Sequence, residues 1–189
     1  MNGQKEKKGC SMGRSPLVKE LLDWFKTLLL AVIIVMLLHY FVFNLSTVKG
    51  HSMQPTLEEK EWLFVNKAVY LFGSPERGNI VIVEDPEHEL KSNEYLVKRV
   101  IGIPGDQIEI RNKRLYLNGE RLVEPYTDLA IEDEDYGPYT VEPGAYFIMG
   151  DNRHAGASRD SRSFGTVSGN NIKGRADFIL WPPTQMKSI

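Results

Sequence analysis

Residues 115–122 read Leu-Tyr-Leu-Asn-Gly-Glu-Arg-Leu, with apolar residues on both sides of an Asn-Gly pair at positions 118 and 119. An Asn-Gly pair readily adopts the two positive φ angles of a type I′ turn, which joins adjacent antiparallel strands. This stretch therefore predicts a β-hairpin. Similar short runs recur along the chain between Gly- and Pro-containing turns, which is the pattern of a mainly β body. The expected strands are Trp62–Val65, Asn79–Val83, Tyr95–Ile101, Gln107–Ile110, Arg114–Leu117, Ala145–Met149 and Ala176–Leu180.

The charges are distributed unevenly over the 189 residues. Residues 1–44 hold six basic and three acidic residues, whereas residues 45–189 hold 17 basic and 22 acidic residues. A mildly acidic body without a basic stripe argues against nucleic-acid binding. The single cysteine, Cys10, excludes an intrachain disulfide. No group of His, Cys, Asp or Glu has the spacing of a metal site, so we expect no metal and no other cofactor.

Residues 28–43 are apolar except for His39. A helix over residues 21–45 is long enough to cross the roughly 30 Å hydrocarbon core of a bilayer, and it has no polar stripe. A buried core helix and a cleavable secretory signal are the alternatives, but no A-x-A-like site follows the apolar run. Basic residues precede the span, which predicts a cytoplasmic tail of residues 1–20 and an extracytoplasmic domain of residues 46–189.

Few other features are expected in this outer domain. One helical turn is expected near Lys67–Phe72, and the acidic stretch Asp128–Tyr136 is expected to be a solvated loop. Met53, Trp62 and Phe64 are candidates for dipping into lipid beside the span, with packing in the core as the alternative for each of them.

A serine and a lysine are candidates for a catalytic pair. Ser52 lies in a turn between a glycine and a proline, where a hydroxyl can be exposed and fixed. Strand alternation places Lys98 on one face between Leu96 and Val100. Desolvation there disfavours the ammonium form, and a general base near neutral pH needs a pKa lowered from about 10.4 to about 7. The alternatives are a serine that only caps a turn and a lysine whose tip reaches water.

A Ser-His-Asp triad is the rival arrangement. His51 adjoins Ser52, so their side chains point apart on an extended backbone. The remaining histidines lie in polar loops or in the apolar run: His39, His88 and His154. None of them is a better base than Lys98.

Four sequence boxes follow one another behind the apolar run. They are Ser-Met-Gln-Pro-Thr at 52–56, Arg-Gly-Asn-Ile-Val at 77–81, Lys-Arg-Val-Ile-Gly-Ile-Pro-Gly-Asp at 98–106, and Gly-Asp-Asn-Arg at 150–153 with Ser-Arg-Asp-Ser-Arg at 158–162. Over most of residues 45–181 they resemble the type I signal peptidase family, with its S-M-x-P-T, R-G-D-I-V, K-R-V-x-G-x-P-G-D and G-D-N-R…S-x-D-S-R boxes. Asn79 replaces the usual Asp of the second box, a change expected to affect structure only.

The resemblance implies an antiparallel β-barrel-like catalytic body with a smaller β excursion over about residues 107–143. It implies that Ser52 is the nucleophile, that neutral Lys98 is the general base, and that the backbone N–H of Ser52 contributes to the oxyanion hole. The implied substrates are secretory preproteins, which would be cut by a single-pass enzyme of the cell membrane without a cofactor.

The same resemblance implies roles for residues around the pair. Ser158 would orient the lysine amine, and Asp160 and Arg162 would form a supporting ion pair. The loop at residues 154–157 is about two residues longer than the family pattern. Gly50 has no hydroxyl, whereas some relatives carry a serine there as an oxyanion donor.

Two further classes of protein remain open. A self-cleaving Ser/Lys repressor protease should carry a helix-turn-helix domain, where this chain has the apolar run. A membrane-tethered binding module would not need both Ser52 and Lys98. The short distance between the apolar run and Ser52 favours an enzyme that acts at the membrane, because residue 52 lies at most about 29 Å from residue 44. Tethering to the same membrane raises the effective concentration of a membrane-bound substrate.

Overall fold

The computed structural model describes residues 16–86 and 95–189. The chain divides into two compact units, residues 1–39 and residues 40–189. Most of the predicted tail, with Cys10, and the loop that holds His88 lie outside the described residues.

Helix α1 (Pro16–Phe41) contains the apolar run. Its described side chains are all exposed within the chain, and no other helix in the described ranges is long and apolar enough to cross a membrane. The sequence predicts a helix over residues 21–45. The observed helix starts and ends earlier, at Pro16 and Phe41. It ends at Phe41 because the next residues form a strand, Phe43–Thr47, whose backbone pairs with a second strand instead of continuing the helix.

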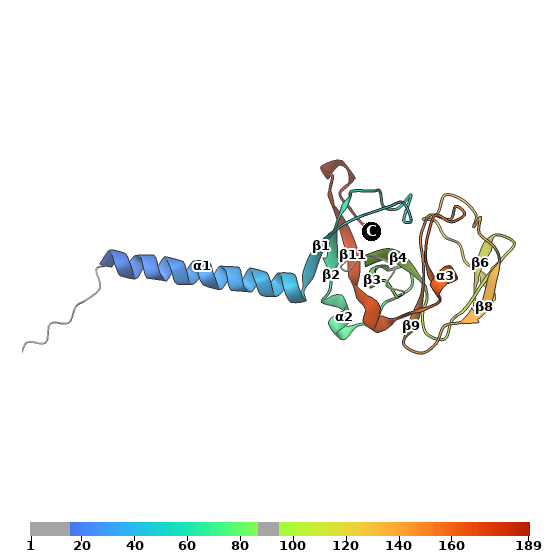
Figure 1. Ribbon diagram of the computed structural model, residues 1–189, viewed down its shortest axis with the longest axis horizontal. Helices are drawn as coiled ribbons and strands as arrows, with labels where there is room; N and C mark the ends of the chain where they lie inside the picture. The colour runs from blue at the N-terminus through green and yellow to red at the C-terminus, as the bar shows by residue number, and fades with distance from the viewer. Residues whose placement is uncertain (1–15, 87–94) are drawn as a thin grey trace, which may run out of the picture. The chain divides into compact units, whose positions relative to one another are not determined.

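The body of the second unit is built on an eight-stranded antiparallel sheet that curls into a half-barrel (Figure 1). Its order is β1-β2-β11-β3-β4-β9-β10, and β12 pairs with β11. The strands are β1 (Phe43–Thr47), β2 (Trp62–Asn66), β3 (Ile80–Glu84), β4 (Tyr95–Gly102), β9 (Ala145–Met149), β10 (Val167–Ser168), β11 (Ile172–Trp181) and β12 (Lys187–Ser188). The prediction of a mainly β, barrel-like body is confirmed, and β1 is the edge strand at one end of the sheet.

A second sheet of four strands forms the smaller β excursion, with the order β7-β6-β5-β8. The strands are β5 (Gln107–Arg111), β6 (Arg114–Leu117), β7 (Glu120–Arg121) and β8 (Tyr136–Thr140). The predicted hairpin joins β6 and β7, and Asn118 and Gly119 have φ angles of 54° and 85° there. In Figure 1 this sheet lies at the end of the body opposite β1.

Three buried apolar clusters hold the body together. One lies under β2 and β11 and contains Met53 and Leu57, and another joins the two sheets through side chains such as Phe147 and Ile108. Met53 is therefore a core residue, and the prediction that it dips into lipid is wrong. Trp62 is about half exposed (49%) and Phe64 is partly buried, so both still reach the surface.

Short helices lie in the loops. The predicted helical turn is confirmed as α2 (Val69–Phe72), whereas α3 (Ser161–Phe164) was not expected. Helix α3 begins where the Asp160 carboxylate accepts a hydrogen bond from Arg162 N–H. Two 3-10 turns complete the unit, at Gly169–Asn171 and Pro183–Gln185.

Candidate active site

The turn that carries Ser52 is fixed to the core by its apolar neighbours. Met53 and Leu57 are both buried, and Leu57 N–H donates to Met53 O at 3.0 Å. Gln54 N–H donates to His51 O at 3.1 Å and closes a tight turn around Ser52. Because Met53 occupies the core side of this turn, Ser52 remains partly accessible.

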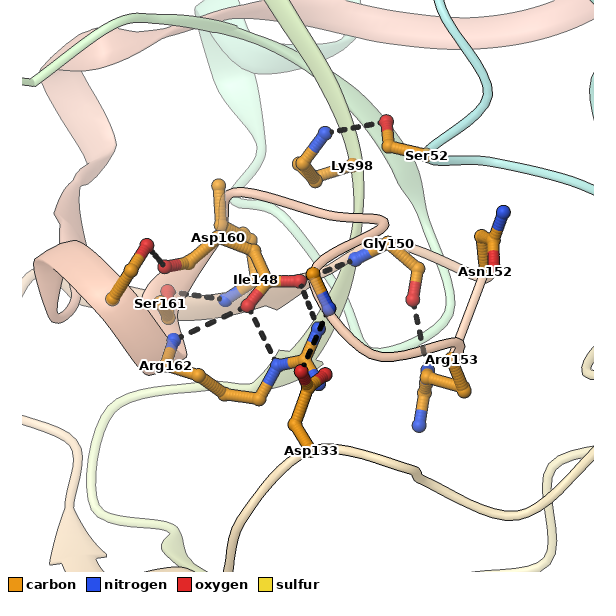
Figure 2. A network of polar contacts seen from close by, with 12 residues as sticks. Ser52, Lys98, Asp133, Ile148, Gly150, Asn152, Arg153, Asp160, Ser161 and Arg162 are labelled. Carbon is orange, nitrogen blue, oxygen red and sulfur yellow. Dashed lines mark hydrogen bonds and ion pairs between the residues drawn. The ribbon is translucent and has the colours of Figure 1, made fainter.

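Lys98 meets this turn from strand β4. Its neighbour across the ladder is Val81 of β3, and only 2% of Lys98 is exposed. The Lys98 Nζ lies 2.8 Å from Ser52 Oγ and 3.0 Å from Val97 O, both hydrogen-bond distances (Figure 2). The predicted pair is therefore in contact, and the alternative of a lysine tip in solvent is excluded.

The ionisation of Lys98 is shifted toward the neutral amine. Burial lowers the pKa of Lys98 to about 8, because an ammonium loses its hydration inside the protein. The carboxylates of Asp160 and Asp151 oppose this shift, and the guanidinium groups of Arg159 and Arg162 reinforce it. A neutral amine can accept a proton from a hydroxyl at 2.8 Å, so the arrangement has the geometry of a nucleophile and its base.

A cleft of about 440 Å³ opens beside Ser52 and Lys98. One wall is the segment 44–50, which contains most of β1, and the other is the segment 95–98 at the start of β4. Strand β1 pairs with β2 alone, and the start of β4 pairs with β3 alone in the described sheet. Each wall therefore presents a free strand edge to the cleft.

A backbone donor is available next to the nucleophile. Among the described residues, no acceptor pairs with Ser52 N–H. Gly50 has a φ of +80°, a conformation that L residues with a side chain rarely adopt, although a Cβ there would have free space. The turn geometry thus favours a glycine at this position, so the donor that the turn offers beside the Ser52 hydroxyl is the backbone N–H.

The histidines in the described part of the chain offer no competing base. In the described part of the chain, no imidazole nitrogen forms a hydrogen bond with Ser52. His154 Nδ1 instead lies 3.1 Å from Glu132 Oε2 at the surface. A Ser-His-Asp triad is therefore absent from the described site.

Asp160 and Arg162 form the predicted ion pair. Arg162 Nε and Nη2 donate to the two carboxylate oxygens of Asp160, each at 2.8 Å. Asp160 Oδ2 also accepts Gly150 N–H at 3.0 Å, which joins the pair to the loop after β9 (Figure 2). Burial alone would raise the pKa of Asp160, but Arg162 and Gly150 N–H hold that pKa below its usual value, so Asp160 stays ionised.

The acidic stretch before β8 also contributes to this site. Asp133 pairs with Arg162 Nη1 and accepts Gly156 N–H at 2.9 Å, and Glu132 Oε2 accepts Ala155 N–H at 3.1 Å. Ile131 is buried between the sheets. The stretch is a loop in which Asp128, Glu132, Glu134 and Asp135 are exposed, so the prediction of a solvated loop is confirmed for most of it. Burial of Ile131 and the bonds to backbone donors of the longer loop at residues 154–157 were not expected.

Ser158 is close to the site but does not contact the lysine as expected. Its Oγ is buried and makes no well-formed hydrogen bond among the described residues, although it lies near enough to the Asp160 carboxylate to help lower the pKa of that group. Gly150 lies between Ser158 and the turn of Ser52 and leaves no room for a side chain. A Cβ there would overlap Ser52 O and Ser158 Oγ, and it would come 2.7 Å from Ser158 Cβ. Gly150 thus allows the nucleophile turn and the Ser158 loop to meet.

Further buried ion pairs between side chains support the site, and no sequence motif identifies them in advance. Arg99, next to Lys98, donates to both carboxylate oxygens of Asp151 at 2.9 and 2.6 Å. Asp151 also accepts Thr56 Oγ1–H at 2.5 Å, which links the lysine strand to the nucleophile turn. Arg153 is fully buried and binds Glu124 of the smaller β excursion at 2.8 and 2.6 Å. Their partners are distant in sequence, so spacing alone does not identify them.

Comparison with known proteins decides the family. Residues 21–181 match the family model described as signal peptidase, peptidase S26. The chain belongs to this signal peptidase family. It is 40% identical over 177 residues to signal peptidase I P of Bacillus subtilis subsp. natto, with 88% of this chain and 92% of the relative covered. It is 37% identical over 186 residues to signal peptidase IB of Staphylococcus aureus (strain N315), with 89% and 94% covered.

Solved structures contain similar chains. A crystal structure of a signal peptidase I from Enterococcus faecalis V583 is 31% identical, with a TM-score of 0.45, and covers 55% of this chain and 97% of its own. The signal peptidase family model begins inside α1 and ends with β11, so it takes in every strand of both sheets except β12 and every site residue described above. As a member of this family, the chain is a protease.

Gly150→Ala tests the packing of this signal peptidase site. The added methyl group would push Ser52 O and Ser158 apart, because the overlap is with backbone as well as side chain. We expect proteolysis to fall about 100-fold, the loss that a displacement of roughly 1 Å produces, with the far-ultraviolet circular dichroism unchanged. Gly169→Ala, at a site with an ordinary φ and a gentler contact of 3.2 Å, is the matched control. Full activity of Gly150→Ala would show that the contact is not strained.

Proposed function

We propose that this chain is a membrane-bound serine endopeptidase that removes N-terminal signal peptides from exported preproteins. The observation that carries the proposal is the 2.8 Å contact between Ser52 Oγ and the amine of a lysine that is almost fully buried. Family membership supports this substrate class, because the curated relatives carry the name signal peptidase I.

In the proposed first half-reaction, Ser52 Oγ attacks the scissile carbonyl carbon while Lys98 Nζ takes the hydroxyl proton. The carbonyl becomes an oxyanion that accepts a hydrogen bond from Ser52 N–H. When the C–N bond breaks, the ammonium of Lys98 returns the proton to the leaving amine. The signal peptide is then held as an ester on Ser52.

The second half-reaction uses the same base. Lys98 Nζ takes a proton from a water molecule, whose oxygen attacks the ester carbonyl. Breakdown of the second tetrahedral intermediate returns the proton to Ser52 Oγ and releases the signal peptide with a carboxylate. The buried Ser158 hydroxyl does not contact Lys98 in this structure, and it would have to turn toward Nζ to accept a hydrogen bond from the Lys98 ammonium that forms in each step.

The free strand edges of the cleft suit an extended peptide substrate. A peptide strand laid between β1 and the start of β4 would exchange backbone hydrogen bonds with both walls. Backbone pairing of this kind is insensitive to side chains, as an enzyme that cuts many preproteins requires. The cleft volume of about 440 Å³ then limits the side chains that fit beside Ser52.

Anchorage in the membrane is part of the proposal. Helix α1 would span the bilayer, with its basic tail in the cytoplasm and residues 46–189 outside. Exposed apolar side chains on neighbouring strands support contact of the body with lipid, since Trp62 and Trp181 are paired across β2 and β11 and are each about half exposed.

The test is a cleavage assay with the full chain in phospholipid vesicles. A model preprotein with an intact signal peptide should be cut once, after a small residue, and mass spectrometry of both products should give the site. A matched preprotein with a bulky residue before the cut should remain intact. Binding of the first preprotein without cleavage would contradict the proposal and favour a tethered binding module.

A further inference from the structure

Asn152 contacts both carbonyl groups that flank the nucleophile. Its backbone N–H donates to Ser52 O at 3.0 Å, and its side-chain Nδ2 donates to His51 O at 3.0 Å. Asn152 lies in the loop after β9 and is 9% exposed (Figure 2). Two hydrogen bonds from one residue thus fix the peptide groups on both sides of Ser52.

The peptide group between His51 and Ser52 contains the proposed oxyanion donor. Because a peptide group is planar, the direction of His51 C=O determines the direction of Ser52 N–H on the other side of the same plane. The Asn152 amide holds this carbonyl together with Gln54 N–H, and it is the only side chain among the described residues that does so, so it helps to aim the N–H. Hydrogen bonding at a carbonyl oxygen also polarises its peptide group, which strengthens the N–H as a donor.

Asn152 is itself held firmly. Its Oδ1 accepts His154 N–H at 3.1 Å, which orients the side-chain amide with Nδ2 toward His51. Its two neighbours are fully buried and form ion pairs with different segments of the body, Asp151 with Arg99 and Arg153 with Glu124. The donor therefore occupies a fixed position relative to the strand that carries Lys98.

We propose that Asn152 is a positioning residue that aims Ser52 N–H at the oxyanion of the tetrahedral intermediate. This inference rests on the proposed function. Asn152 does not touch the substrate in this role, and it acts in the transition state, when the carbonyl oxygen becomes charged. Its loss should therefore lower kcat and leave KM nearly unchanged.

Asn152→Asp separates this role from a structural one. The variant keeps the size of the side chain and an acceptor for His154 N–H, but it replaces the donor to His51 O with an oxygen. We expect kcat to fall about 10- to 100-fold, since one misaligned oxyanion donor costs at most the roughly 100- to 1000-fold loss of a missing one. Asn152→Ala, which keeps the backbone bond to Ser52, should show a similar loss. Asn170→Asp at an exposed site controls for the added charge.

The decisive readout is binding of a peptide aldehyde with the substrate sequence, whose adduct with a serine carries the tetrahedral oxygen. The affinity for the aldehyde should fall by the same factor as kcat/KM, while the affinity for an uncleavable peptide stays at the parent value. The pH midpoint of activity should stay at the parent value in Asn152→Ala, which adds no charge near Lys98. Equal losses for both ligands, a large drop in thermal stability, or parental kcat in Asn152→Asp would overturn the positioning role. If the parent chain cleaves no preprotein at all, the proposed function itself fails.

Discussion

Ser52→Ala should abolish cleavage of a preprotein. The substitution removes the one oxygen that lies 2.8 Å from Lys98 Nζ, and the neighbouring hydroxyl of Ser158 is buried without contact to the cleft. We expect a loss of about 10⁶-fold in kcat, the size found when the nucleophile of another serine protease is removed. Product formation should be followed by mass spectrometry over long incubations, because the remaining rate is small.

Folding and binding should survive this change. The turn is held by Met53 and Leu57 and by backbone bonds, none of which uses the Ser52 hydroxyl. Ser52→Ala should therefore bind an uncleavable peptide with parental affinity, and Ser74→Ala at an exposed loop should retain full activity. Cleavage by Ser52→Ala at more than about 1% of the parental rate would identify a different nucleophile.

Lys98→Met should have the second largest effect. Methionine has a similar length and an unbranched chain, so it fills the buried space while removing the amine. Loss of a general base costs up to about 10⁴-fold, and we expect a loss of at least this size because Lys98 serves in both half-reactions. Single-turnover measurements with labelled preprotein should show that formation of the acyl-enzyme is slowed.

The thermal unfolding temperature of Lys98→Met should be close to that of the parent. Burial of the amine opposes its charged form, so an apolar replacement relieves a cost and offsets the hydrogen bond lost at Val97 O. Lys187→Met on an exposed strand is the matched control. Near-normal cleavage by Lys98→Met would move the role of base to another residue, and a histidine would be the first candidate.

Most strands could be predicted because apolar runs and turn residues are local signals. The Asn118-Gly119 hairpin was correct for this reason. Strand β8 was missed because it follows an acidic stretch and contains Gly137 and Pro138, which disfavour strands, although pairing with β5 overcomes this preference. The end of α1 was also missed, because pairing of β1 with β2 stops the helix and no local signal marks this point.

The contact between Ser52 and Lys98 could be predicted from motifs, but the residues that surround and hold this pair could not. Asn152 lies 101 residues from His51, and Arg153 lies 29 residues from Glu124, so only the fold brings these groups together. The buried ion pairs look like ordinary surface charges in the sequence. Met53 is misjudged in the opposite direction. In the sequence it is an apolar residue close to the membrane span, which suggests lipid contact, but in the structure it is buried in the core.

The pH dependence of kcat/KM tests the central claim most directly, because it reports the ionisation of the base in the free enzyme. The amine is active when neutral, so cleavage should be low near pH 6, rise tenfold per pH unit, and level off above a midpoint near the pKa of about 8 that burial gives Lys98. The uncleavable-peptide affinity should stay constant over the same range. A profile already flat from pH 5 upward would contradict a titrating lysine as the base for Ser52.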